Sequence, residues 1–215
     1  METVLYQYWR SSASWRVRWA LGVKNIAFTS VPIDITKGDQ DLAEHRARNP
    51  VGHVPALFID GKIFAESVAI FEYLDETRPV SPLYPKSPLT RARVRQAVEL
   101  VNSAIQPYQN LITLRRVPGA EADKRAWAKY WNERGLHALE ALVANVAAEI
   151  PSDGRFCVGS ELTAADLFVV PQLATARRFD VDLGPMPRLR AIESAVTALP
   201  HAAAALPERQ PGASA

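Results

Sequence analysis

The sequence predicts a mixed α/β domain followed by an all-helical domain, and three observations lead to that division. The first 80 residues alternate between short β-rich runs and runs with helical spacing, in the order βαβ, helix, ββα. Four prolines within residues 78–90 then indicate a linker. After this linker the chain shows helical stretches and no convincing strand pattern. We therefore expect domains at residues 1–80 and 88–207, with a disordered tail at 208–215.

The first half of the α/β domain is predicted from two β-rich runs and the helical pattern between them. Residues 3–8 (TVLYQY) have the composition of a strand. Trp15 and Trp19 lie four residues apart, a spacing that predicts a helix over residues 12–23. A second strand is expected over residues 27–33 (AFTSVPI), which completes the βαβ unit.

The second half is predicted as a short polar helix, a hairpin and a further helix. The polar helix is expected over residues 39–48. Residues 54–67 (VPALFIDGKIFAES) contain two β-rich runs joined at Asp60-Gly61, a dipeptide typical of tight hairpin turns. Ser67 is then expected to cap a helix, because serine favours that position and helical spacing follows it.

The second domain is predicted to contain four main helical stretches. Two long ones are expected over residues 90–115 and 120–149. Thr163 and Asp166 resemble a capping box, which predicts that a helix begins at residue 163. A further helix is expected after Pro187, because proline is tolerated in the first turn.

The bulk properties exclude several classes of protein. A net charge of +2 gives no case for nucleic-acid binding. No apolar stretch approaches the roughly 20 residues that cross a bilayer, and the N-terminus lacks a signal-peptide pattern. The single cysteine, Cys157, rules out an internal disulfide and suits a reducing compartment. We expect a cytoplasmic protein without a metal site, bound neither to membranes nor to nucleic acid.

Ser11 and Ser12 lie where the first strand gives way to the first helix. Serine at a helix start usually caps the helix through its side-chain oxygen. The same place is also a ready anion site, because the first amide hydrogens are unpaired and the helix end carries partial positive charge. A hydroxyl and free amides there can stabilise a thiolate and lower its pKa. Both interpretations are open.

His53, Val54 and Pro55 precede the third predicted strand, where a proline needs an explanation because it cannot donate to a ladder. One interpretation is an ordinary trans proline in a loop. The other is a cis Val54–Pro55 bond, which would turn the backbone of Val54 outward to pair with an extended peptide.

Glu66 and Ser67 also precede a helix, as a plain cap or as a second anion site for a carboxylate, with Glu66 available for an α-ammonium group. Each of the three signals is weak alone. Together they place a thiolate site, a peptide-backbone site and an amino-acid site on one small domain. Those are the chemical groups of glutathione.

Several longer segments then resemble the zeta class of glutathione transferases in the expected order along nearly the whole chain. They are SSASWRVR (11–18), NPVGHVPAL (49–57), ESVAIFEYLDETRP (66–79), IQPYQNL (105–111), FCVGSELTAADLFVVPQ (156–172) and RFDVDL (178–183). The resemblance implies a thioredoxin-like domain followed by an all-helical glutathione-transferase C-terminal domain, glutathione as cofactor, and a homodimer.

The resemblance also implies roles for individual residues of the first domain. Ser11 would hold the glutathione sulfur as thiolate, with Ser12 in support. The remaining contacts to glutathione would come from His53 near the glycyl end, Val54 across cis-Pro55 along the cysteinyl backbone, and Glu66 and Ser67 at the γ-glutamyl end.

In the second domain, Gln106 matches a glutathione- or substrate-contacting glutamine of the family, and Asn110 is a polar candidate beside it. Arg178 matches an arginine proposed to bind a substrate carboxylate, and Arg10 is expected across the same cleft. Without the resemblance, both arginines would be interpreted as solvated surface charges. A small dicarboxylate is therefore the implied substrate.

The resemblance implies a glutathione-dependent isomerase that converts maleylacetoacetate to fumarylacetoacetate in tyrosine and phenylalanine breakdown, with glutathione transferase activity. Ala13 departs from the Ser-Ser-Cys of the eukaryotic isomerases and puts the substrate in doubt. Maleylpyruvate isomerisation, in gentisate breakdown, and transfer to α-halo acids are alternatives. A non-catalytic glutathione-transferase-like binding protein is the alternative from another class. A thiol oxidoreductase is set aside, because it would need a cysteine at the helix start.

The remaining arginines and tryptophans near these segments are expected to serve the fold. Arg16 and Arg18 are expected to pair within it. The tryptophans at helical spacing are expected in the core rather than as ligand platforms; they are Trp15, Trp19, Trp127 and Trp131.

Overall fold

Residues 2–213 are described by a computed structural model, and they divide into two units. Unit 1 combines Met1–Leu83 with Leu199–Ala215, and unit 2 is Tyr84–Ala198. This division differs from the predicted one at the C-terminal end. Residues 199–207 were expected in the helical domain, yet they pack with the first unit.

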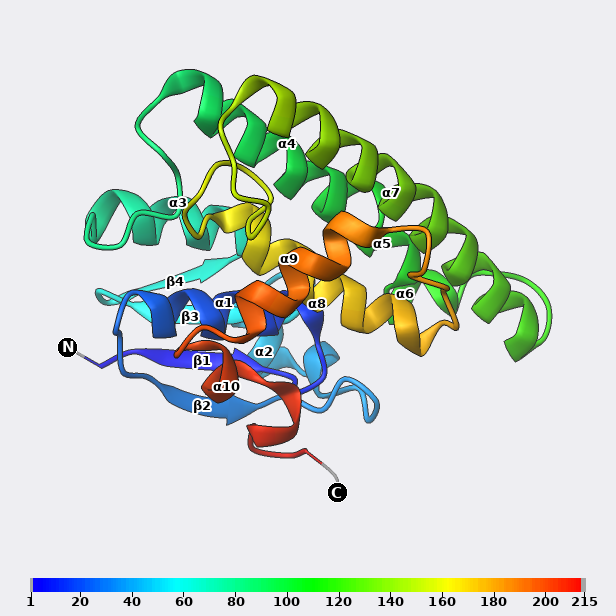
Figure 1. Ribbon diagram of the computed structural model, residues 1–215. Helices are drawn as coiled ribbons and strands as arrows, with labels where there is room; N and C mark the ends of the chain where they lie inside the picture. Colours follow the sequence, from blue (N-terminus) through cyan, green and yellow to red (C-terminus); the bar gives the residue numbers. More distant parts are fainter. Residues whose placement is uncertain (1, 214–215) are drawn as a thin grey trace. The chain divides into compact units, whose positions relative to one another are not determined.

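Unit 1 is built on one mixed four-stranded sheet (Figure 1). The strands are β1 (Val4–Gln7), β2 (Thr29–Pro32), β3 (Ala56–Ile59) and β4 (Lys62–Ala65), in the order β2-β1-β3-β4. β1 pairs with β2 in parallel, and β3 pairs with both β1 and β4 antiparallel. The predicted βαβ unit and hairpin are confirmed, with strands shorter than expected at their ends.

The sheet register brings three separate chain segments to one end of the sheet. Tyr6, in the last half of β1, pairs with Ala56 at the start of β3. Ala56 in turn pairs with Ala65 at the end of β4. The segments that leave β1, enter β3 and leave β4 therefore all emerge at the same end.

The β3–β4 hairpin turns at Asp60 and Gly61, as the sequence predicts. Their φ angles are 54° and 73°, so both residues adopt the left-handed conformation of a type I′ turn. Glycine reaches that conformation without a side-chain clash, and aspartate tolerates it better than most residues. Asp60 is further held by Arg78, whose Nη2 donates to its carboxylate at 2.7 Å.

The N-terminal segment of unit 1 contains the helices α1, α2 and α3, with one 3-10 turn between the first two. Their bounds are α1 Ser12–Val23, η1 Asp39–Asp41, α2 Ala43–Arg48 and α3 Ser67–Thr77. α1 packs against α3 and buries Trp19 and Leu21 completely, while α3 buries Ile70, Phe71 and Leu74. This apolar contact fixes the two helix starts relative to the sheet.

The prediction of a disordered tail is wrong for residues 208–213, which the structure describes. The chain folds as α10 (Ala202–Ala205) and η2 (Pro207–Arg209), and α10 packs on α1. Buried Arg18 donates from Nε to the Ala205 carbonyl at 2.6 Å, and from Nη1 to the Gln7 Oε1 at 2.9 Å. Burial lowers the pKa of Arg18 to about 9. Residues 214–215 of the predicted tail lie outside the described residues.

Unit 2 is helical throughout its described regular structure. Its helices are α4 (Pro88–Ala104), α5 (Gln106–Gln109), α6 (Leu111–Leu114), α7 (Glu121–Glu149), α8 (Ala164–Arg178) and α9 (Pro187–Thr197). The long helices α4 and α7 run side by side (Figure 1). Within residues 2–213, no helix combines the length and apolar character that crossing a bilayer requires.

The single helix expected over residues 90–115 is wrong, because the chain breaks at Ile105. Pro107 lacks the N–H that would donate to the Ser103 carbonyl in a continuous helix, and its ring would clash with that carbonyl. Ile105 accordingly has φ −123° and ψ −63°, outside the helical range. The break creates the separate four-residue helix α5.

Helix α8 begins where the sequence predicts and forms the centre of unit 2. The Asp166 carboxylate accepts from the Thr163 N–H at 2.8 Å and from the Cys157 N–H at 2.7 Å. Burial raises the pKa of Asp166, and these two N–H groups oppose that rise. The carboxylate thus joins the preceding loop to the helix start.

The expectation that the tryptophans lie in the core is confirmed in unit 1 and is wrong for one tryptophan of unit 2. Trp15 and Trp19 are buried and stack at 6.1 Å between ring centroids. Trp131 is half-buried, whereas Trp127 is 38% exposed and therefore not a core residue. Trp127, on α7, instead donates from Nε1 to the carbonyl of Tyr108 on α5 at 3.1 Å.

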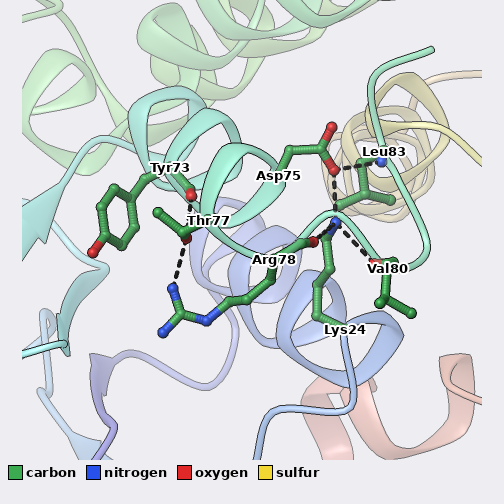
Figure 2. A network of polar contacts seen from close by, with 7 residues as sticks. All are labelled: Lys24, Tyr73, Asp75, Thr77, Arg78, Val80 and Leu83. Carbon is green, nitrogen blue, oxygen red and sulfur yellow. Dashed lines mark hydrogen bonds and ion pairs between the residues drawn. The ribbon is translucent and has the colours of Figure 1, made fainter. Parts of the chain in front are cut away.

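A buried ammonium group fixes the end of α3 and the chain that follows it (Figure 2). The Lys24 side chain is 0% exposed and donates from Nζ to Asp75 Oδ1 at 2.7 Å and to the Arg78 carbonyl at 2.8 Å. A third bond reaches the Val80 carbonyl at 3.2 Å. Asp75 Oδ1 also accepts from the Leu83 N–H at 2.7 Å. The Lys24–Asp75 ion pair therefore holds the chain that follows α3 in place as far as Leu83.

We expect Lys24→Met to lower the free energy of unfolding by about 3 kcal/mol, because it leaves the largely buried Asp75 carboxylate without its lysine counter-ion. Urea denaturation followed by circular dichroism measures this loss. Lys37→Met is the matched control, since Lys37 pairs with Asp34 but is 78% exposed. It should change stability by less than about 0.5 kcal/mol. Equal effects of the two substitutions would contradict the role of Lys24.

Candidate functional site

The turn from β1 into α1 presents Ser11 as the N-cap of the helix. Its Oγ accepts from the Ser14 N–H at 3.2 Å, and its backbone is extended with φ −67° and ψ 124°. The N–H groups of Ser12 and Ala13 form no hydrogen bond with other described residues. The cap that the sequence suggested is present, and the free N–H groups of an anion site accompany it.

The Val54–Pro55 peptide bond is cis, the second of the two alternatives that the sequence left open. Val54 is half-buried, and neither its N–H nor its C=O bonds to the backbone elsewhere in residues 2–213. An extended peptide can therefore pair with this backbone as a strand would. Pro55 itself is buried and leads directly into β3.

Two buried polar residues, which the sequence analysis missed, hold the chain just before Val54. His45 on α2 has its Nε2 at 2.9 Å from the His53 carbonyl oxygen, and Asn49 Nδ2 donates to the same oxygen at 3.0 Å. Both side chains belong to residues exposed by 2% or less. The sequence signal was the turn-forming Asn49-Pro50 dipeptide. The half-buried His53 thus uses its carbonyl to fix the loop.

The start of α3 corrects the expected role of Ser67. The N-cap is Glu66, and Ser67 is the first residue of the helix, so the prediction of Ser67 as the cap is wrong. Glu66 is exposed and has φ 65° and ψ 114°, a conformation that L-residues rarely adopt. Such strained backbone is concentrated at binding and catalytic sites.

Arg16 reaches the same place from α1. It is 0% exposed, and its Nη1 donates to Ser67 Oγ at 3.4 Å. The Ser67 oxygen accepts this hydrogen bond from the guanidinium group. The hydroxyl hydrogen of Ser67 therefore remains available to an acceptor on a ligand. The predicted role of Arg16 within the fold is confirmed, and the contact links α1 to the candidate site.

These three segments converge because of the sheet register. Ser11 follows β1, Val54 precedes β3, and Ser67 follows β4, so all three lie at one end of the sheet. Two helix N-termini, two hydroxyls and one unpaired stretch of backbone therefore face the same end. Such a set of donors and acceptors suits a small peptide with negatively charged groups.

In unit 2 the structure joins two of the predicted polar residues. Gln106 opens α5, and its Nε2 donates to Oδ1 of Asn110, the residue after α5, at 2.6 Å. Both side chains are half-buried. This hydrogen bond uses one N–H of Gln106, so the other side-chain N–H groups of the pair can donate to a ligand.

The two predicted arginines lie in different units. Arg178 ends α8 and is exposed, and its carbonyl accepts from Arg125 Nη2 at 2.9 Å. Arg10 in unit 1 is exposed beside the Trp9 ring, with 5.4 Å between the guanidinium carbon and the ring centroid.

Cys157 offers no alternative nucleophile. It is 2% exposed, and burial raises the pKa of its thiol well above the usual range, with the nearby Asp166 charge adding to the rise. A buried neutral thiol is a poor nucleophile. In the described part of the chain, no three His, Cys, Asp or Glu side chains are grouped as metal ligands.

Comparison with known proteins agrees with this geometry. Residues 1–76 match the family model of the glutathione S-transferase N-terminal domain. A Drosophila melanogaster protein named probable maleylacetoacetate isomerase 2 is 46% identical over 98% of this chain and 90% of its own length. A solved bacterial maleyl pyruvate isomerase of the zeta class is 35% identical, covers 98% of this chain and 100% of its own, and superimposes with a TM-score of 0.93.

The chain belongs to the zeta class of glutathione transferases.

A further solved relative has ligands of the expected chemistry. The maleylacetoacetate isomerase from Anaeromyxobacter dehalogenans has dicarboxyethyl glutathione and citrate bound in its active site. It is 42% identical, covers 100% of this chain and 98% of its own, and has a TM-score of 0.86. In this zeta-class chain, unit 1 contains the thioredoxin-like glutathione-transferase domain and unit 2 the helical one, as predicted.

Proposed function

We propose that this chain is a glutathione-dependent isomerase that converts maleylacetoacetate to fumarylacetoacetate. The observation that carries the proposal is the convergence of Ser11, Val54 and Ser67 at one end of the sheet. That arrangement can take the thiol, the peptide backbone and the α-carboxylate of one glutathione molecule. The full-length similarity to proteins named maleylacetoacetate isomerase supports the choice of reaction.

The residues present fit glutathione by the chemistry of their donor set. The free N–H groups at the start of α1 suit a thiolate, and the unpaired backbone of Val54 suits the cysteinyl amide groups. The start of α3 and the Ser67 hydroxyl suit a carboxylate, while the exposed Glu66 suits an α-ammonium group. His53 is assigned to the glycyl end.

When bound, glutathione supplies a thiolate that adds to the double bond and leaves again after rotation. The task of Ser11 is to donate its hydroxyl hydrogen to the sulfur and so stabilise the charged form. Ser12 and the partial positive charge of the α1 N-terminus support that charge. Arg16 holds the Ser67 oxygen, which leaves the Ser67 hydrogen directed to the γ-glutamyl carboxylate.

The substrate is a dianion with a carboxylate at each end, so cationic and amide groups are needed to hold it. We assign Arg178 and Arg10 to its carboxylates, with Gln106 and Asn110 as neutral donors. Holding both carboxylates restrains the reacting atoms of the substrate. Amide and guanidinium donors also stabilise the negative charge that develops on the conjugated oxygen.

Maleylpyruvate is the second candidate substrate, and the structural similarity to a maleyl pyruvate isomerase favours it specifically. Both substrates need the same thiolate and the same carboxylate contacts. Ala13, in place of a cysteine, changes neither set of contacts. Transfer of glutathione to α-halo acids would use the same thiolate.

A non-catalytic binding protein would not need the thiolate site. Here Ser11 caps α1, cis-Pro55 turns the Val54 backbone outward, and Ser67 is polarised by Arg16. The presence of all these features favours an enzyme. We further propose a cytoplasmic homodimer that acts in tyrosine and phenylalanine breakdown, and sedimentation velocity showing only monomers would contradict the dimer.

The first test is a side-by-side assay of both cis substrates with and without glutathione. We expect loss of maleylacetoacetate only when glutathione is present, at a rate well above that for maleylpyruvate. The opposite preference would favour the second candidate. Tight glutathione binding without isomerisation of either substrate would contradict both isomerase assignments and leave transfer chemistry.

We expect Ser11→Ala to lower turnover about 100-fold, because the lost hydrogen bond is strongest to the charged sulfur. The pKa of bound glutathione should rise, while its dissociation constant changes little; a thiolate absorbance titration measures the pKa.

Ser87→Ala is the matched control for Ser11→Ala. Ser87 also caps a helix, with its Oγ accepting from the Thr90 N–H at 3.5 Å. Loss of either cap should cost about 1 kcal/mol of stability. Only Ser11→Ala should change the thiol titration, and an unchanged titration together with wild-type turnover would refute the role of Ser11.

We expect Arg178→Ala to raise the Michaelis constant for the dicarboxylate substrate about tenfold or more, because a charge-assisted hydrogen bond is lost. Glutathione binding should stay unchanged. Arg177→Ala is the control, since the neighbouring Arg177 forms an ion pair with Glu193 and is given no role in binding. An equal loss of rate with an uncharged electrophile would argue against a carboxylate contact at Arg178.

A further inference from the structure

Three buried amide side chains form a closed network inside unit 2. Gln109 comes from α5, Asn132 from α7 and Gln172 from α8, and each is exposed by 8% or less. Gln109 Nε2 donates to Gln172 Oε1 at 3.1 Å, and Gln172 Nε2 donates back to Gln109 Oε1 at 3.1 Å. Asn132 Nδ2 donates to Gln109 Oε1 at 2.7 Å, and Gln172 Nε2 donates to Asn132 Oδ1 at 2.6 Å.

Every nitrogen and oxygen of this amide triangle has a partner. Asn132 Nδ2 uses its second hydrogen for the Ala128 carbonyl at 2.8 Å. A buried amide that loses its partner is destabilising, so the satisfied triangle strongly favours one arrangement of the three helices. The triangle thereby fixes where α5 lies against α7 and α8.

Helix α5 needs such external support because it has only four residues. An isolated helix of that length does not form in water. Ile105, just before it, packs against Gly135 of α7 so closely that a Cβ at Gly135 would clash with Ile105 Cγ1. Tyr108 stacks on Trp131 of α7 with 3.9 Å between centroids. The amide triangle completes this support at Gln109, on the inner side of α5.

The supported turn carries the two amide residues assigned to the ligand. Gln106 lies one turn before Gln109, and Asn110 follows it directly. Their mutual hydrogen bond of 2.6 Å ties both side chains to the position of α5. A shift of α5 would therefore move both amide groups together.

We propose that Gln109, Asn132 and Gln172 are positioning residues that hold Gln106 and Asn110 in the geometry that binds the dicarboxylate part of the ligand. This inference rests on the proposed function, because it takes from it the roles of Gln106 and Asn110. The triangle touches no ligand and acts only through α5. Apolar residues can fill a helical core without buried amides, so the amides contribute a defined geometry.

The test is isothermal titration of two ligands, glutathione and dicarboxyethyl glutathione, in which a dicarboxyethyl group replaces the thiol hydrogen. Loss of the free thiol is common to the native chain and its variants, so the change in the ratio of dissociation constants between them isolates the contacts to the dicarboxylate group. We expect Gln109→Met and Gln172→Met each to reduce the preference for dicarboxyethyl glutathione about tenfold or more, since small displacements of binding groups cause losses of this size. The dissociation constant of glutathione itself should stay within about twofold.

Two further variants separate positioning from stability. Leu139→Ala removes a fully buried side chain from α7, away from the triangle, and should lower the melting temperature without changing the ratio. The triple variant Gln109→Met, Asn132→Leu, Gln172→Met leaves no buried amide unpaired. It should recover the melting temperature of the single variants or exceed it, and still lack the preference. If a single variant fails to fold, the triple variant replaces it in the titration.

The inference is overturned if the folded triangle variants keep the wild-type ratio, or if Leu139→Ala changes the ratio as much as they do. It is also overturned if the native chain shows no preference for dicarboxyethyl glutathione. Turnover of maleylacetoacetate is measured separately and tests the proposed function. A native chain that prefers the dicarboxylate ligand without isomerising maleylacetoacetate would refute the isomerase and retain the positioning role.

Discussion

The antiparallel pairing of β1 with β3 is the constraint on which the candidate glutathione site depends. Because Tyr6 pairs with Ala56, the end of one strand lies beside the start of the other. The hairpin then adds the end of β4 at the same edge through Ala65. A slip of one residue would turn every side chain of β3 to the opposite face. Burial of Leu57 and Ile59 opposes that slip, so the same apolar residues maintain both core and site.

Buried polar groups then define the geometry that the apolar core leaves open. Arg18 ties the C-terminal segment to Gln7, Lys24 ties the end of α3 to α1, and Asp166 ties a loop to α8. Each such group would be destabilising without its partners, so each selects one arrangement. The amide triangle does the same without charge.

The sequence predicted most of the fold because local signals and periodicity agree in this chain. The hairpin at Asp60-Gly61, the capping of α8 by Asp166 and the Ser11 cap all depend on residues close in sequence. The prediction of a disordered tail failed because distant contacts decide the outcome there. The C-terminal segment is ordered by Arg18, which lies 187 residues from Ala205. Likewise, the strained backbone of Glu66 has no signature in residue types alone.

The chain has no cysteine at the start of α1, so the candidate site is suited to the sulfur of a bound ligand. The start of α1 stabilises a thiolate, and a cysteine there would itself be activated. Ala13 removes that possibility, and the chain has only one cysteine. Cys157 is buried beside the Asp166 carboxylate, and both conditions raise the pKa of its thiol. Under the proposed function, no protein thiolate therefore competes with the glutathione thiolate that we assign to Ser11.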